Sequence, residues 1–182
     1  MKAVQKILVV GGAGYVGSAL IMSLLEKGYD ITLYDLMIYG ANIIPKHPRL
    51  TIIQGDIRDV DHLASNLLGV ETVIHLACIS NDPSFELNHE LGKSINFDCF
   101  EPFVGACVSA GVKRFIYASS SSVYGIKNHE NVIETDVLEP LTDYSKYKVL
   151  CEKVLSHYQN DSFHTVIVRP ATVCGYSPRV RL

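Results

Sequence analysis

Residues 6–17 read Lys-Ile-Leu-Val-Val-Gly-Gly-Ala-Gly-Tyr-Val-Gly, an apolar run that leads directly into a glycine-rich turn. The run Lys6–Val10 predicts a buried strand, and apolar residues at helical spacing over 14–27 predict a helix that Gly28 caps. Glycines let the backbone turn tightly and approach a phosphate closely, and a helix start offers free amides with a partial positive charge. Two registers fit, Gly12-x-Gly14-x-x-Gly17 and Gly11-x-x-Gly14-x-x-Gly17, so the stretch predicts a dinucleotide-binding turn.

The same alternation of strand and helix continues along the chain. Apolar runs predict further strands at 31–34, 50–53, 72–77, 114–119 and 165–168, and helical spacing predicts helices at 60–68, over much of 88–110 and at 141–159. Pro102 lies inside the second of these helices and predicts a kink there. Near-continuous apolar strands that alternate with helices predict an α/β fold with a doubly wound parallel sheet of the Rossmann type.

The composition restricts the class of protein. The chain has 182 residues, 48% of them hydrophobic, which suffices for one domain with a substantial core. The net charge of −3 and the lack of a basic tract speak against a nucleic-acid partner. Five cysteines without a Cys-x-x-Cys predict a reducing, cytoplasmic setting. No signal peptide or membrane-spanning stretch is visible, and no histidine or cysteine spacing predicts a metal site.

Two acidic residues follow expected strands at the edge where ligands bind. Asp35 ends the second strand and is a natural acceptor for ribose hydroxyls. The residues after it supply no cation to balance a 2′-phosphate, so we expect NAD rather than NADP as the cofactor. The alternative is a glycine-rich turn without a ligand. Asp56 ends the third strand and either faces the ligand or caps the next helix, for which Asp59 is the better candidate.

A second set of residues suggests proton transfer. Tyr144 and Lys148 are four residues apart and share one face of the predicted helix. An ammonium beside a phenol lowers the phenol pKa and makes the tyrosine usable as a base, although such a pair also occurs as an ordinary surface pair. A serine run at 119–122 follows a strand, and a hydroxyl there, as at Ser120, could hydrogen-bond a substrate oxygen; the alternative is a solvated loop.

Taken in order, these motifs, with Asp56-Ile57-Arg58-Asp59, His75-Leu76-Ala77, Ser120–Gly125 and Arg169–Thr172, resemble the extended short-chain dehydrogenases/reductases. More narrowly, they resemble the NAD-dependent nucleotide-sugar epimerase/dehydratase family. The resemblance implies that Ser120, Tyr144 and Lys148 are catalytic and that Asn96 is structural. It implies cofactor contacts from Gly11, Gly14, Tyr15, Val16, Gly17, Asp35, Asp56, Ile57, Leu76, Ala77, Tyr144, Lys148 and Pro170.

The chain departs from the family pattern in two ways. Dehydratases of the family carry an acidic residue where this chain has Ser121 and Ser122, which favours an epimerase acting on a nucleotide sugar. A sugar dehydrogenase or reductase and a non-catalytic dinucleotide-sensing regulator are the alternatives. Family members are also longer, so we expect residues 1–182 to form the NAD-binding Rossmann domain, with the smaller substrate domain missing after Leu182.

The resemblance also implies a homodimer that pairs the helices expected at 88–110 and 141–159. Four apolar residues of the first helix could contribute to that interface, and packing in the core is the alternative for them: Phe97, Phe100, Phe103 and Val104.

Overall fold

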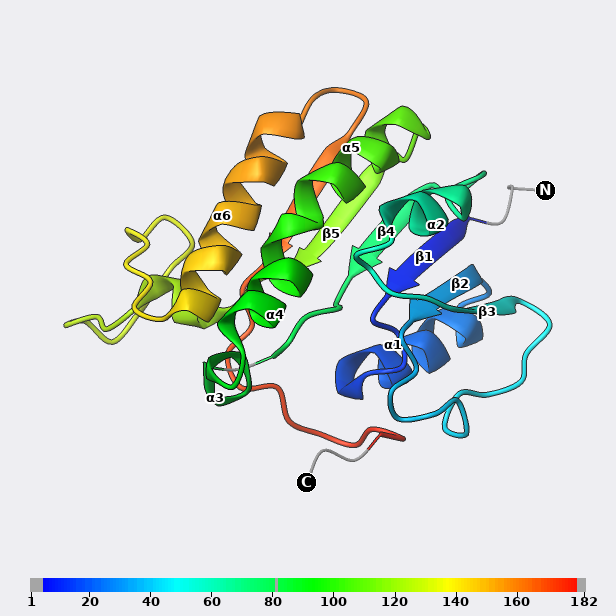
Figure 1. Cartoon of the computed structure of the whole chain (residues 1–182), viewed down its shortest axis with the longest axis horizontal. Helices are drawn as coiled ribbons and strands as arrows, with labels where there is room; N and C mark the ends of the chain where they lie inside the picture. The colour runs from blue at the N-terminus through cyan, green and yellow to red at the C-terminus, as the bar shows by residue number, and fades with distance from the viewer. Residues whose placement is uncertain (1–4, 81, 180–182) are drawn as a thin grey trace.

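The fold is a six-stranded parallel sheet between two layers of helices, as a computed structural model shows for residues 5–80 and 82–179 (Figure 1). The strands follow the spatial order β3-β2-β1-β4-β5-β6. Their bounds are β1 Lys6–Val10, β2 Asp30–Asp35, β3 Leu50–Gln54, β4 Thr72–His75, β5 Arg114–Ala118 and β6 His164–Val168. The predicted Rossmann-type sheet is therefore confirmed, and each strand end lies within two residues of its predicted position.

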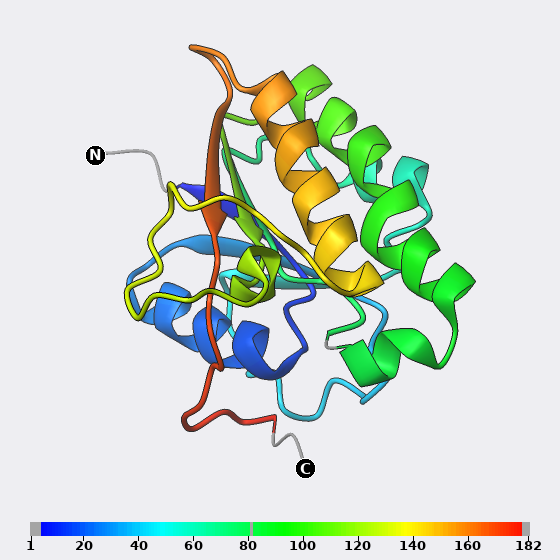
Figure 2. The ribbon, with the colours of Figure 1, turned by 90° about the vertical axis from the view of Figure 1, so that its left-hand side faces the viewer.

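Alternate residues of β1 explain why both faces of the sheet are covered. Ile7 and Val9 belong to a core cluster that includes Ile21 and Leu25 of α1 (Tyr15–Glu26). Leu8 belongs to a second cluster, to which the helices α2 (Val60–Ser65), α5 (Phe100–Ser109) and α6 (Asp143–Tyr158) contribute. Figure 2 shows α1 on one side of the sheet and α5 and α6 on the other. Because β1 is buried on both faces, its continuous apolar sequence is what a central parallel strand requires.

The helix expected at 88–110 is divided into three parts. It consists of α4 (His89–Lys93), a π-helical turn η1 (Ser94–Asp98) and α5. The predicted kink at Pro102 is wrong in position, because the interruption lies one turn earlier. Pro102 lies in the first turn of α5, where a residue without a backbone N–H is tolerated. A short helix α3 (Asp82–Glu86), which the sequence did not predict, precedes this segment.

Most of the aromatic residues in this segment are core residues rather than surface residues. Phe100, Phe103 and Val104 are at most 1% exposed, whereas Phe97 is partly buried and stacks on the ring of Tyr147 in α6. Packing in the core, the alternative to an interface role, is therefore the right interpretation for Phe100, Phe103 and Val104. None of the described helices is long and apolar enough to cross a membrane.

Candidate active site

The glycine turn lies where the strand order reverses, between β1 and its neighbour β4. Gly11 has a φ of +83°, and a Cβ there would lie 2.4 Å from the backbone nitrogen of Ala77. A Cβ on Gly17 would lie 2.6 Å from the carbonyl oxygen of Gly11, so both positions exclude a side chain. This crevice at the carboxyl ends of the strands is where open α/β sheets bind dinucleotides.

Asp35 joins the end of β2 to this turn. Its Oδ2 accepts a hydrogen bond from the backbone N–H of Ala13 at 3.0 Å, and its Oδ1 accepts one from that of Met37 at 2.8 Å. Asp35 is half-buried, and a carboxylate offers about four acceptor positions. It therefore retains the capacity to accept hydrogen bonds from ribose hydroxyls.

Asp56 and Ile57 lie after β3. Arg58 binds the Asp56 carboxylate through Nε at 2.9 Å and Nη2 at 2.5 Å, and these hydrogen bonds hold the pKa of Asp56 below its usual value. Asp59 accepts from the backbone N–H of His62 at 3.0 Å and caps α2, as the sequence suggested. The Ile57 side chain is 7% exposed and belongs to the core, so it offers little surface to a ligand.

Four further predicted cofactor residues lie in the loop after β4 and in the first turn of α1. The backbone N–H groups of Leu76 and Ala77 both donate to the carbonyl oxygen of Val10. These hydrogen bonds attach the loop after β4 to the end of β1. In the first turn of α1, the Tyr15 hydroxyl donates to the carbonyl oxygen of Gly175 and the Val16 side chain is 42% exposed.

Lys148 joins α6 to the end of β5. Its Nζ donates to the carbonyl oxygen of Ala118 at 2.7 Å and lies 5.6 Å from the centroid of the Tyr144 ring. The lysine is 3% exposed. Thr142 caps α6 in a reciprocal capping box with Ser145, so the first turn, which carries Tyr144, is fixed at its start. The structure thus places the predicted tyrosine and lysine on one face of α6.

Ser120 follows β5 and caps the 3-10 turn η2 (Ser121–Tyr124). Its Oγ accepts hydrogen bonds from the backbone N–H of Ser122 at 3.2 Å and from the Ser122 hydroxyl at 2.9 Å. The Pro170 carbonyl oxygen, after β6, accepts from the backbone N–H of Ser121 at 2.9 Å. Since both lone pairs of Ser120 are engaged, its own O–H is oriented for donation elsewhere.

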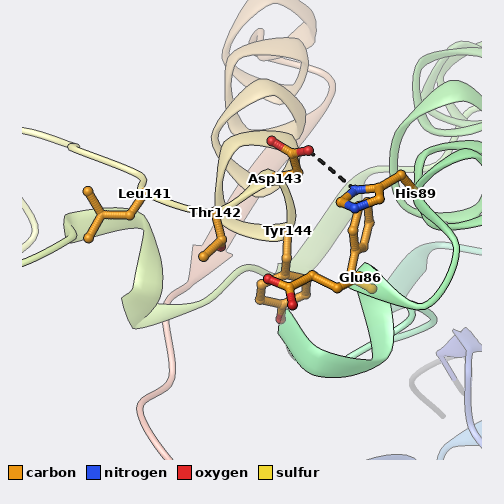
Figure 3. Close-up of a pocket in the computed structure, with 7 residues that line it drawn as sticks. Glu86, His89, Leu141, Thr142, Asp143 and Tyr144 are labelled. Atoms are coloured by element: carbon orange, nitrogen blue, oxygen red, sulfur yellow. Dashed lines mark ion pairs between the residues drawn. The ribbon is translucent and has the colours of Figure 1, made fainter.

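A cavity of about 250 Å³ opens beside Tyr144. Figure 3 shows that the N-terminal end of α6 forms one side and that Glu86 and His89 come from α3 and α4. His89 Nδ1 lies 3.4 Å from Asp143 Oδ2. A hydrogen bond from Lys146, and then the charges of Lys146 and His89, keep the pKa of Asp143 below its usual value. The full lining is Phe85, Glu86, His89, Leu141, Thr142, Asp143 and Tyr144.

The structure also reveals a buried group that the sequence prediction did not assign. Glu152 of α6, Arg169 after β6 and Ser119 before Ser120 are connected by hydrogen bonds. A signal existed in the sequence, because Glu152 is four residues after Lys148 and therefore lies on the same helix face. Asn96, expected to be structural, is 6% exposed and exchanges two hydrogen bonds with the backbone of Ile79. Among the described residues, no cluster of three His, Cys, Asp or Glu could hold a metal ion.

Comparison with known proteins agrees with this geometry. The model of the NAD-dependent epimerase/dehydratase family matches residues 7–181. The chain is 32% identical over 180 residues to a 3β-hydroxysteroid dehydrogenase/Δ5→4-isomerase of Mycobacterium tuberculosis, covering 93% of this chain and 47% of that protein.

Two solved structures extend the comparison to bound ligands. The UDP-N-acetylglucosamine 4-epimerase of Methanobrevibacter ruminantium, in complex with UDP-N-acetylmuramic acid, superposes with a TM-score of 0.84 at 27% identity, covering 91% of this chain and 54% of that one. The dTDP-glucose 4,6-dehydratase DesIV of Streptomyces venezuelae, with NAD bound, gives 0.82 at 28% identity, covering 91% and 55%. The chain thus spans about half the length of these relatives.

Proposed function

The chain belongs to the NAD-dependent epimerase/dehydratase family, and from this premise we propose that it is the cofactor-binding and proton-transfer domain of a nucleotide-sugar epimerase. The observation that carries the proposal is the placement of Tyr144 and Lys148 on one face of α6, with the Lys148 ammonium bound to the end of β5. Ser120 follows two residues after that strand, at the same edge of the sheet as the glycine turn.

The residues present fit NAD. Gly11 and Gly17 leave room only for backbone, so a pyrophosphate can approach the start of α1 closely. Asp35 would accept hydrogen bonds from the adenosine ribose and would repel a 2′-phosphate. When bound, NAD supplies removal and return of a hydride at the sugar carbon.

The protein side chains would then transfer the proton of the sugar hydroxyl. Tyr144 accepts the proton of a sugar hydroxyl, because the nearby Lys148 ammonium favours the phenolate form. Ser120 donates its O–H to the same sugar oxygen as negative charge develops on it, since its lone pairs are held by Ser122. On return, Tyr144 gives the proton back, so the chain ends the cycle unchanged.

The mixed lining of the cavity beside Tyr144 suits a sugar, which carries hydroxyl groups as well as apolar C–H faces. Glu86, His89 and Asp143 line it and can pair with hydroxyl groups. In the serine segment, Ser121 and Ser122 supply no carboxylic acid to assist loss of water, which supports epimerisation over 4,6-dehydration. We extend the proposal to a homodimer, which the family resemblance implied, and to a cytoplasmic location, which the cysteine usage implied.

A net dehydrogenase acting on a sterol alcohol is the second candidate, because curated relatives at about 30% identity include a hydroxysteroid dehydrogenase and sterol-4-alpha-carboxylate 3-dehydrogenases. The same tyrosine and lysine would serve it, but its substrate would present an apolar body rather than hydroxyls. The cavity beside Tyr144 is lined by the apolar side chains of Phe85 and Leu141 as well as by Glu86, His89 and Asp143, so only the substrate panel distinguishes the two candidates.

The test is a substrate panel supplied with NAD to the natural protein that contains these residues. UDP-, GDP-, CDP- and dTDP-hexoses and a 3β-hydroxysterol are incubated in separate reactions. The nucleotide sugars are separated by ion-exchange chromatography, and NADH is followed by absorbance in every reaction. Interconversion of two hexose epimers without net NADH is the expected result. Accumulating NADH with a sugar or with a 3β-hydroxysterol, or a 4-keto-6-deoxy product seen by mass spectrometry, would contradict it.

A further inference from the structure

An ion pair between the buried Glu152 and the partly buried Arg169 lies behind the serine segment and takes no part in the proposed proton transfer. Glu152 is 4% exposed. Arg169 donates to its carboxylate through Nε at 3.0 Å and through Nη2 at 2.7 Å. Desolvating two charges is costly, and replacing a buried ion pair by apolar residues is often neutral or stabilising. Stability alone therefore does not account for this pair.

The pair holds the first end of the serine segment. Glu152 also accepts a hydrogen bond from the Ser119 hydroxyl at 2.5 Å, and Ser119 is 4% exposed. Ser119 directly precedes Ser120, whereas Glu152 lies one turn beyond Lys148 on the same face of α6. This carboxylate thus connects the helix that carries Tyr144 and Lys148 to the strand end that carries Ser120.

Arg169 holds the other end of the segment. Its Nη1 donates to the Tyr124 hydroxyl at 2.8 Å and to the carbonyl oxygen of Glu134 at 3.0 Å. Tyr124 is the last residue of η2 and is 8% exposed. Ser120 and its partner Ser122 therefore lie between two points, Ser119 and Tyr124, that the same ion pair fixes.

We infer that Glu152 and Arg169 are positioning residues that set Ser120 in register with Tyr144 and Lys148. Neither is expected to touch substrate, and the inference rests on the proposed function. Proton transfer requires the serine and tyrosine hydroxyls to meet one sugar oxygen, and a misplacement of about 1 Å can cost about 10²-fold in rate.

Two variants separate the Glu152–Arg169 ion pair from the Ser119–Glu152 hydrogen bond. Glu152→Gln keeps an acceptor for Ser119 but removes the charge that Arg169 binds, and Ser119→Ala removes one hydroxyl and leaves the ion pair intact. Lys113→Gln is the matched control, because it breaks an exposed pair with Glu71 at the opposite end of the strands, where the Nζ–Oε2 distance is 3.7 Å.

The first measurement is hydrogen exchange of the peptide that contains residues 119–125, which needs no turnover. We expect exchange to be at least about tenfold faster in Glu152→Gln, with that of α1 unchanged. We expect the second measurement, steady-state kinetics, to show kcat about 10²-fold lower in Glu152→Gln and about tenfold lower in Ser119→Ala. KM and the NAD Kd should stay within about twofold of the parent, and Lys113→Gln should match the parent throughout.

The outcomes are distinguishable. Unchanged exchange in Glu152→Gln, or kcat within about twofold of the parent in both variants, would overturn the inference. A parallel loss of kcat, NAD affinity and folded protein would show a merely structural role. If Glu152→Gln does not fold, Ser119→Ala decides by the same measurements. If the parent converts no nucleotide sugar but exchange still rises, the proposed function fails while the segment is shown to be held by this pair.

Discussion

The Tyr144 hydroxyl is the atom on which the proposed proton transfer depends. Tyr144→Phe removes only that oxygen, so we expect kcat to fall by about 10²–10⁴-fold, the usual contribution of a positioned acid or base. NAD affinity should change by less than about twofold. Tyr147→Phe is a suitable control, because Tyr147 lies on the same helix and stacks on Phe97. A Tyr144→Phe variant with near-normal kcat would assign the base to another residue.

His75 makes the stability of the fold sensitive to acid. It is 3% exposed, four aromatic rings surround it, and within the described chain its Nδ1 has no hydrogen-bond partner. Burial, and then the charge of Lys148, lower the pKa of His75 from 6.5 to about 3. Between these values the unfolded chain binds a proton that the folded chain does not.

Stability from this group is therefore fully present above pH 6.5 and is lost as the pH falls toward 3. From pH 7 to 5.5 we expect its contribution to the unfolding free energy to fall by about 1 kcal/mol. His75→Phe should remove that part of the pH dependence in urea titrations, whereas the exposed His157→Gln should retain it. Equal pH slopes for the parent and His75→Phe would rule out His75 as the source.

At the scale of elements, the start of α6 matters most because it carries Tyr144. The Thr142 hydroxyl oxygen accepts a hydrogen bond from the backbone N–H of Ser145, and the Ser145 hydroxyl oxygen accepts one from the backbone N–H of Thr142. Thr142→Ala should lower the unfolding free energy by about 1 kcal/mol, the usual value of an N-cap. Lys153→Ala, at an exposed position of the same helix, should stay within about 0.5 kcal/mol. Urea unfolding that does not distinguish the two would contradict the cap assignment.

The strands and the glycine turn could be predicted from sequence, because apolar runs and glycine spacing are local signals. The same holds for Tyr144 and Lys148, whose spacing places them on one helix face. The interruption lies at η1 rather than at Pro102 itself, because a residue without an N–H cannot bond to the carbonyl four residues earlier and therefore disturbs the preceding turn. The link from Glu152 to Arg169 joins residues 17 positions apart, so only the tertiary structure shows it.

At the scale of the whole molecule, the predicted cofactor residues come from several strand ends and from the helices α1 and α6. Gly11 follows β1, Asp35 ends β2, Ala77 follows β4, and Lys148 contacts the end of β5. A ligand that touches all of them therefore binds the folded chain and has no comparable site on the unfolded one. Binding must then raise the stability of the entire domain.

NAD should stabilise the 182-residue chain more than NADP does. At a concentration of about 100 times its Kd, a ligand specific for the folded state adds about 2.7 kcal/mol. We expect a rise in Tm that grows with NAD concentration. The shift with NADP should be smaller, because Asp35 would face the adenosine ribose and repel a 2′-phosphate on it. Differential scanning fluorimetry over a range of concentrations of both cofactors measures these Tm shifts.

Asp35→Ser should narrow the difference between the Tm shifts with NAD and with NADP, since it removes the repelling charge. A larger shift with NADP on the parent would show that Asp35 does not select the cofactor, and no shift with either would show that the glycine turn of this chain does not bind a dinucleotide.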